Sequence, residues 1–164
     1  MTVFEPILAA LTNSGVRFVV VGGVATVLHG HPRFTADLDV ALDLTADSPG
    51  RAIDALTDLG LVPSLPVPAR DFADPDKRAE WVGTRQLMVF SLIDPDDPFR
   101  RVDLFAEDPI PFDELWARSK VVTLGTMSVR IASIDDLIAM KRAAGRSQDL
   151  ADVEALERIR DRQP

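Results

Sequence analysis

The chain has 164 residues, enough for one domain with a substantial core, and its 46% hydrophobic and 27% charged residues are ordinary for a globular protein. The absence of cysteine excludes disulfides and thiolate zinc sites, and the only histidines, His29 and His31, argue against a histidine-rich metal site. The net charge of −8 argues against a broad basic surface for nucleic acid, but not against a local one. The sequence shows neither a signal peptide nor about 20 consecutive apolar residues, so we expect a cytoplasmic protein without a membrane span.

The first part of the chain predicts alternating helices and strands. In chain order we expect a helix over 4–14, a strand over 17–21, a helix over 24–28, a strand over 36–44 and a helix over 49–59. The second strand has a period of two, in which Asp37 and Asp39 alternate with apolar residues on the other face. Asp47 or Ser48 can cap the helix that follows, and Gly60 ends it.

Prolines and charged residues dominate the next segment, residues 61–80, where we expect loop or mobile structure. Beyond it we expect strands over 86–93 and 100–105, a helix over 112–119, and a hairpin of 121–123 and 127–131 that turns at Gly125.

The C-terminal part is predicted to be helical. Ser133 begins one helix and Gly145 stops it, and Ser147 caps a last helix. We therefore expect a single mixed α/β (α+β) domain over residues 1–164, in which flanking helices cover a mixed β-sheet and residues 132–164 add the C-terminal helices.

Three carboxylates carry the predicted chemistry. Asp37 and Asp39 are two residues apart on a strand, so both side chains leave the same face. Such neighbours repel each other unless a cation lies between them, and Mg²⁺ prefers oxygen ligands of this kind. Asp103 is the natural third carboxylate if its strand lies beside 36–44. Two Mg²⁺ ions held there can activate an attacking hydroxyl and stabilise a leaving pyrophosphate. The alternative is that Asp37 and Asp39 face solvent on an exposed sheet.

Gly22 and Gly23 lie between a strand and a short helix, shortly before the carboxylate strand. Glycine lets a backbone approach phosphate closely, and a helix N-terminus offers unpaired N–H groups and a dipole that favours an anion. A Gly-Gly turn alone is more often structural. Beside a metal site, however, it predicts a phosphate cradle.

Together these residues resemble the nucleotidyltransferase superfamily, whose core is the polymerase-β-like minimal fold. Two stretches are similar, more narrowly, to the AbiEii-type toxin group. They comprise Val20-Val21-Gly22-Gly23-Val24-Ala25, His29-Gly30, Arg33, Thr35 and Asp37-Leu38-Asp39, and, in the tail, Ser133-Ile134-Asp135-Asp136-Leu137-Ile138-Ala139-Met140-Lys141, Ala144-Gly145-Arg146 and Asp149. The wider superfamily pattern has serine after the first glycine, where this chain has Gly23.

The resemblance implies a nucleotidyltransferase fold and Mg²⁺-dependent transfer of a nucleoside monophosphate from an NTP to an acceptor hydroxyl. Asp37 and Asp39 would hold both ions, and Asp103 would bind the ion that activates the acceptor. In the toxin branch the acceptor is a tRNA 3′ end, and an antitoxin is the partner. Two alternatives stay open: a small-molecule (antibiotic-type) nucleotidyltransferase, and a catalytically silent binding module of the same fold.

Four further residues are candidates for holding the nucleotide. Lys141 projects from an apolar helical face, either to contact the triphosphate or to extend into solvent. In the resembling toxins a lysine and a downstream aspartate act together, and Asp149 has the matching spacing, although it can equally favour a helix N-terminus. Arg33 and Thr35 precede the carboxylate strand and can contact phosphate or base. Arg33 can also form an ion pair with Asp37 or with Asp43.

Overall fold

The computed structural model describes residues 3–162, which form a seven-stranded mixed sheet of order β3-β4-β5-β2-β1-β7-β6. The strands are β1 (Phe18–Val20), β2 (Leu38–Leu42), β3 (Val62–Pro63), β4 (Val89–Ile93), β5 (Arg101–Phe105), β6 (Lys120–Leu124) and β7 (Met127–Ile131). The helices are α1 (Glu5–Asn13), α2 (Gly22–Leu28), α3 (Ser48–Asp58), the 3-10 helix η1 (Ala69–Ala73), α4 (Pro75–Arg85), α5 (Phe112–Arg118), α6 (Ile134–Ala144) and α7 (Ser147–Arg160). The predicted mixed α/β fold class is confirmed.

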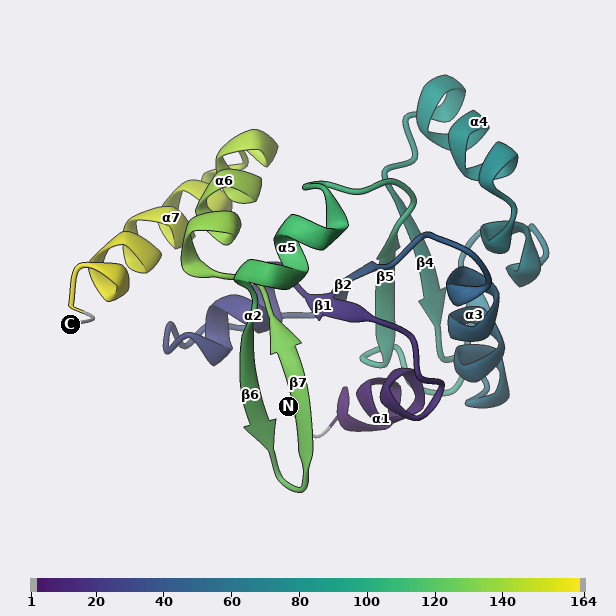
Figure 1. The fold of residues 1–164 in the computed structure, drawn as a ribbon, viewed down its shortest axis with the longest axis horizontal. Coiled ribbons are helices and arrows are strands. Elements are labelled where there is room, and N and C mark those ends of the chain that lie inside the picture. The colour runs from purple at the N-terminus through teal and green to yellow at the C-terminus, as the bar shows by residue number, and fades with distance from the viewer. Residues whose placement is uncertain (1–2, 163–164) are drawn as a thin grey trace.

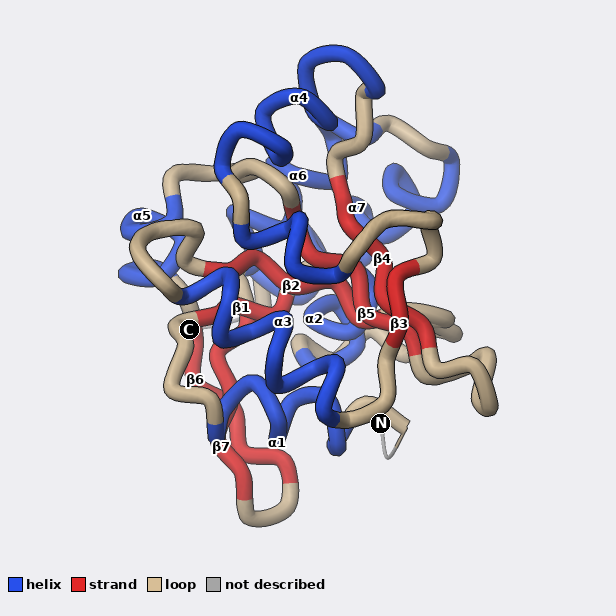
Figure 2. Tube along the Cα trace, turned by 90° about the vertical axis from the view of Figure 1, so that its right-hand side faces the viewer, coloured by secondary structure: helices blue, strands red, loops and turns tan. Residues whose placement is uncertain are grey.

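Helices cover the sheet on both sides. Figure 2 shows α1 and α3 on the near side and α2, α6 and α7 beyond it, while Figure 1 places α6 and α7 at the end opposite α3 and α4. Leu38 and Val40 of β2 and Leu104 of β5 are fully buried and share a core cluster with apolar residues of α1 and α3. The alternation in β2 therefore sends its apolar residues to the core and leaves Asp39 for the opposite face.

The prediction of a loop over residues 61–80 is wrong. Besides β3, this stretch holds η1 and the first half of α4, which Asp74 caps by accepting hydrogen bonds from the next backbone N–H groups. Pro75 is the first residue of the helix, where proline is well tolerated because its missing N–H would be unpaired anyway. Phe72 and Trp81 are buried and both stack on Phe90 of β4, so this segment belongs to the core.

The predicted ends of the C-terminal helices are confirmed in part. The Ser133 hydroxyl accepts the Asp136 N–H at 3.1 Å at the start of α6, and Gly145 ends it with φ +66°. Ser147 does not cap α7. Arg146 occupies that position, and the Asp149 carboxylate accepts its backbone N–H, because an acid three residues into a helix can reach back to the cap. Within residues 3–162 no helix is both long and apolar enough to cross a membrane.

Candidate active site

Asp39 and Asp103 face each other across neighbouring strands. Strands β2 and β5 are parallel and pair directly, with Asp39 in register with Asp103, as the sequence argument required. Strand β2 begins at Leu38 and not at residue 36 as predicted, so Asp37 lies just before the strand. All three carboxylates line one cavity of about 640 Å³. Asp37 and Asp39 are both partly buried and lie at this cavity rather than on an open face of the sheet.

The cavity also brings together every other residue predicted to hold the nucleotide. Its lining includes the two glycines, the two residues before the carboxylate strand, and the two C-terminal candidates: Gly22, Gly23, Arg33, Thr35, Lys141 and Asp149. These residues come from the start of α2, the segment before β2, α6 and the start of α7. Segments from both ends of the chain thus meet at one site.

The carboxylates differ in their electrostatic surroundings. Burial, followed by the nearby charges of Asp37 and Asp103, raises the pKa of Asp39 to about 6. Asp103 is 6% exposed, and Arg101 donates to it with Nε–Oδ1 at 3.0 Å. Sequence reasoning treated the three acids as an uncompensated cluster and missed Arg101, which offsets the charge of one of them. Its position two residues before Asp103, on the same face of the strand, was the available signal.

The carboxylate oxygens in this cavity could bind a metal ion, but they are not close enough together to form a complete coordination site. Among residues 3–162, no three His, Asp or Glu side chains are arranged to enclose a metal ion. The mostly buried Asp39, next to two other carboxylates, nevertheless has the chemistry of a divalent cation ligand.

The two glycines bring the start of α2 against the carboxylate strand. They form the first turn of α2 rather than a turn before it, which corrects the predicted helix start. Gly22 has φ +60°, and a Cβ added there would overlap the Asp39 carboxylate. Asp39 also accepts the Gly23 N–H. The close approach of α2 to Asp39 thus requires glycine at residue 22.

Gly23 is enclosed by the segment that precedes β2. A Cβ at Gly23 would lie 2.5 Å from Arg33 Nη2 and 2.7 Å from Thr35 Oγ1. Serine, which the wider superfamily has here, would displace both side chains, and this is a physical reason for the second glycine. Of the alternatives left open for Arg33, an ion pair with Asp37 or Asp43 is not the contact found, because Arg33 Nη1 lies 3.5 Å from Asp152 Oδ2.

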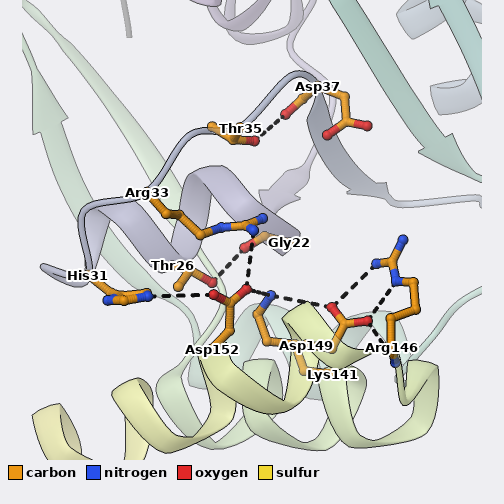
Figure 3. A network of polar contacts seen from close by, with 10 residues as sticks. All are labelled: Gly22, Thr26, His31, Arg33, Thr35, Asp37, Lys141, Arg146, Asp149 and Asp152. Atoms are coloured by element: carbon orange, nitrogen blue, oxygen red, sulfur yellow. Dashed lines mark hydrogen bonds and ion pairs between the residues drawn. The ribbon is translucent and has the colours of Figure 1, made fainter.

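Lys141 is buried in an ion-pair network rather than extended into solvent. It is 6% exposed, and its Nζ lies 2.6 Å from Asp152 Oδ2 and 3.8 Å from Asp149 Oδ1. Asp152 also lies 3.6 Å from His31 Nε2, so it links α6, α7 and the segment before β2 (Figure 3). Sequence reasoning missed Asp152. Its spacing of three from Asp149 puts both acids on one face of α7, which was the available signal.

Asp149 is held by its neighbour at the start of α7. Arg146 donates to it with Nε–Oδ2 at 2.6 Å, while most of the Arg146 side chain stays exposed at the cavity. This contact and the proximity of Lys141 keep the pKa of Asp149 below its ordinary value despite burial. Both readings of Asp149 are thus compatible with its position, because it lies close to Lys141 and also caps α7.

Residues 7–163 match the sequence profile of the family described as "Nucleotidyl transferase AbiEii toxin, Type IV TA system". The chain belongs to the AbiEii family. It is therefore a nucleotidyltransferase, which speaks against the catalytically silent module. Membership in this toxin family also implies, in general terms, an NTP substrate and an antitoxin partner.

Solved structures share the fold. The lincosamide antibiotic adenylyltransferase LnuA, bound to lincomycin, is 15% identical with a TM-score of 0.64, and the match covers 96% of each chain. The antibiotic-resistance factor ANT(2'')-Ia is 15% identical with a TM-score of 0.59, over 98% of this chain and 88% of the other. No curated protein sequence matches the chain.

Proposed function

We propose that this AbiEii-family protein moves a nucleoside monophosphate from an NTP to an acceptor hydroxyl in the presence of Mg²⁺, and that the acceptor is a tRNA 3′ end. The observation that carries this proposal is the pair Asp39 and Asp103, in register on adjacent strands within a cavity that Lys141 also lines. In the proposed reaction the acceptor hydroxyl releases its proton to solvent, its oxygen forms a bond to the α-phosphorus, and pyrophosphate leaves with the electrons of the broken P–O bond.

The carboxylates are suited to hold the metal ions. Asp37 and Asp39 supply adjacent oxygen donors, and a cation would relieve the repulsion that, together with burial, raises the pKa of Asp39. Mg²⁺ bound there would neutralise charge on the triphosphate and activate the acceptor hydroxyl. Arg101 fixes the orientation of Asp103, which we place on the acceptor side of the cavity.

The opposite side of the cavity is suited to the triphosphate. Lys141 and Arg33 supply positive charge there, and their shared contact with Asp152 holds both side chains in place before the nucleotide arrives. Holding cations in advance lowers the ordering cost of binding. We place the triphosphate between these cations and the glycine-rich start of α2, with Thr35 and Asp149 beside it.

The choice of acceptor rests on the toxin description of the family and on local charge. Despite the net charge of −8, the exposed Arg146 lies at the cavity and can contact an acceptor phosphate. A small-molecule acceptor is the second candidate, because two proteins of similar fold are a lincosamide antibiotic adenylyltransferase and an antibiotic-resistance factor.

The test incubates the protein with each labelled NTP, Mg²⁺ and either total tRNA or a panel of antibiotics. Asp39→Asn is the inactive variant, and Asp47→Asn is the matched control because Asp47 is exposed at the start of α3 and does not line the cavity. We expect label on tRNA with wild type and the control, but not with Asp39→Asn. Label only on an antibiotic would move the assignment to the second candidate. Transfer that persists in Asp39→Asn would overturn the proposed site.

A further inference from the structure

Phe34 is an exposed aromatic ring at the rim of the candidate active site. Phe34 is 75% exposed. Several large hydrophobic side chains of residues 3–162 are exposed, and of these only Phe34 lines the cavity. Scattered exposed apolar residues need no explanation, but one placed at a polar cavity is a candidate contact for a ligand.

The backbone on both sides of Phe34 is anchored. On one side, Arg33 and His31 both lie against the buried Asp152. On the other side, the Thr35 hydroxyl donates to the Asp37 carbonyl at 3.0 Å. Figure 3 shows this segment passing over the start of α2 between these two attachments. The segment that carries the ring is therefore held to α7 on one side and by a local hydrogen bond on the other, which lowers the cost of ordering its backbone when a ligand binds.

The side chains on either side of Phe34 turn toward the proposed triphosphate cradle. The Arg33 and Thr35 side chains both occupy the space that a Cβ at Gly23 would need, whereas the Phe34 side chain remains largely in solvent. A triphosphate at the start of α2 would thus have an aromatic ring within one residue of its contacts. Asp103, which we place on the acceptor side, lies on β5 and not on the segment that carries Phe34.

We infer that Phe34 is a stacking platform for the base of the incoming NTP, and this inference rests on the proposed function. A phenylalanine ring offers a flat apolar face that suits any base, so the contact adds affinity for a nucleoside rather than choice among bases. A phenylalanine ring makes no hydrogen bond to phosphate, so the triphosphate would be bound by the glycines of α2 and by Arg33 and Lys141. The contribution of Phe34 to affinity can therefore be measured separately from the contribution of the phosphate contacts.

The experiment compares two probes that differ only in whether they carry a base. Dissociation constants of ATP, GTP, CTP and UTP, and of inorganic tripolyphosphate, are measured with Mg²⁺ and without acceptor, for wild type, Phe34→Ala and Phe34→Trp. Phe99→Ala is the matched control, since Phe99 is also largely exposed but does not line the cavity. Loss of one base–aromatic stack weakens binding by roughly tenfold or more.

We expect Phe34→Ala to weaken the best-bound NTP about tenfold and to leave tripolyphosphate unchanged, while Phe34→Trp retains NTP affinity. Equal weakening of both probes would overturn the inference in favour of a structural role for the segment. Unchanged binding of both probes, with a raised KM for the acceptor, would overturn it in favour of an acceptor contact. If wild type bound neither probe, the proposed function itself would fail, and that result is distinct from the other two.

Discussion

Replacing Asp39 with asparagine should stabilise the metal-free protein while it removes activity. The pKa of Asp39 is raised from an ordinary 3.8 to about 6, first by burial and then by Asp37 and Asp103. A rise of about 2 pH units corresponds to about 3 kcal/mol against the ionised folded state. Asparagine has nearly the same shape, keeps an oxygen that accepts the Gly23 N–H, and carries no charge.

The sign and the pH window follow from this shift. Because the folded state holds the Asp39 proton more tightly than the unfolded state, the contribution of Asp39 to the stability of wild type falls as pH rises from about 4 to about 6 and is then constant. The gain from Asp39→Asn should therefore be about 2–3 kcal/mol at pH 7.5 and below about 1 kcal/mol at pH 4.

Urea unfolding in EDTA at both pH values measures these differences, with Asp47→Asn as a control that shifts stability by less than about 0.5 kcal/mol. Added Mg²⁺ should raise the unfolding free energy of wild type at pH 7.5 but not that of Asp39→Asn. A gain that is independent of pH, or a loss of stability at pH 7.5, would refute the electrostatic argument. A Mg²⁺ effect that survives Asp39→Asn would refute the assignment of Asp39 as a ligand.

Three other substitutions test separate parts of the structure. Gly22→Ala should abolish transfer and destabilise the fold by more than about 1 kcal/mol, because the added Cβ meets strain at φ +60° and overlap with a carboxylate; urea unfolding and the transfer assay measure both effects. Asp152→Asn should cost about 3 kcal/mol in urea unfolding and raise the KM for NTP, since it leaves Lys141 buried without its closest partner. Trp81→Ala should cost about 3–5 kcal/mol in thermal or urea unfolding, because it removes a buried, stacked ring from a segment that its prolines made look like a loop.

Each of these variants has a control in the chain. Gly125→Ala has the same positive φ but open space around its Cβ, so it should cost strain alone and keep full activity; equal behaviour of the two glycine variants would contradict the proposed overlap. Asp161→Asn, on an exposed carboxylate beyond α7, should be neutral, and a neutral Asp152→Asn would disprove the anchoring role of Asp152. Trp81→Phe should recover most of the stability that alanine loses, and no recovery would count against ring packing as the cause.

Local signals in the sequence were sufficient for most elements and for the carboxylate pair. The placement of Asp39 opposite the buried Leu38 and Val40 requires only the strand period, although Asp37 lies just before the strand, and Gly145 ends a helix by a local backbone preference. The same local signals failed over residues 61–80. Proline there begins α4 instead of breaking the chain, and Trp81 of that helix is buried against Phe90 of the strand that follows it.

The sequence by itself therefore determined the superfamily, the order of most elements and the nine candidate site residues, because these depend on residue type and short spacing. Only the tertiary structure decided how those residues are partnered. Asp103 is neutralised in part by Arg101, and Lys141 and Arg33 converge on Asp152, an acid whose spacing from Asp149 indicates its face of α7 but not these two partners. The physical reason is that Arg33 and Lys141 reach Asp152 from other segments of the chain, so these contacts depend on distance and burial in the folded protein and not on local spacing.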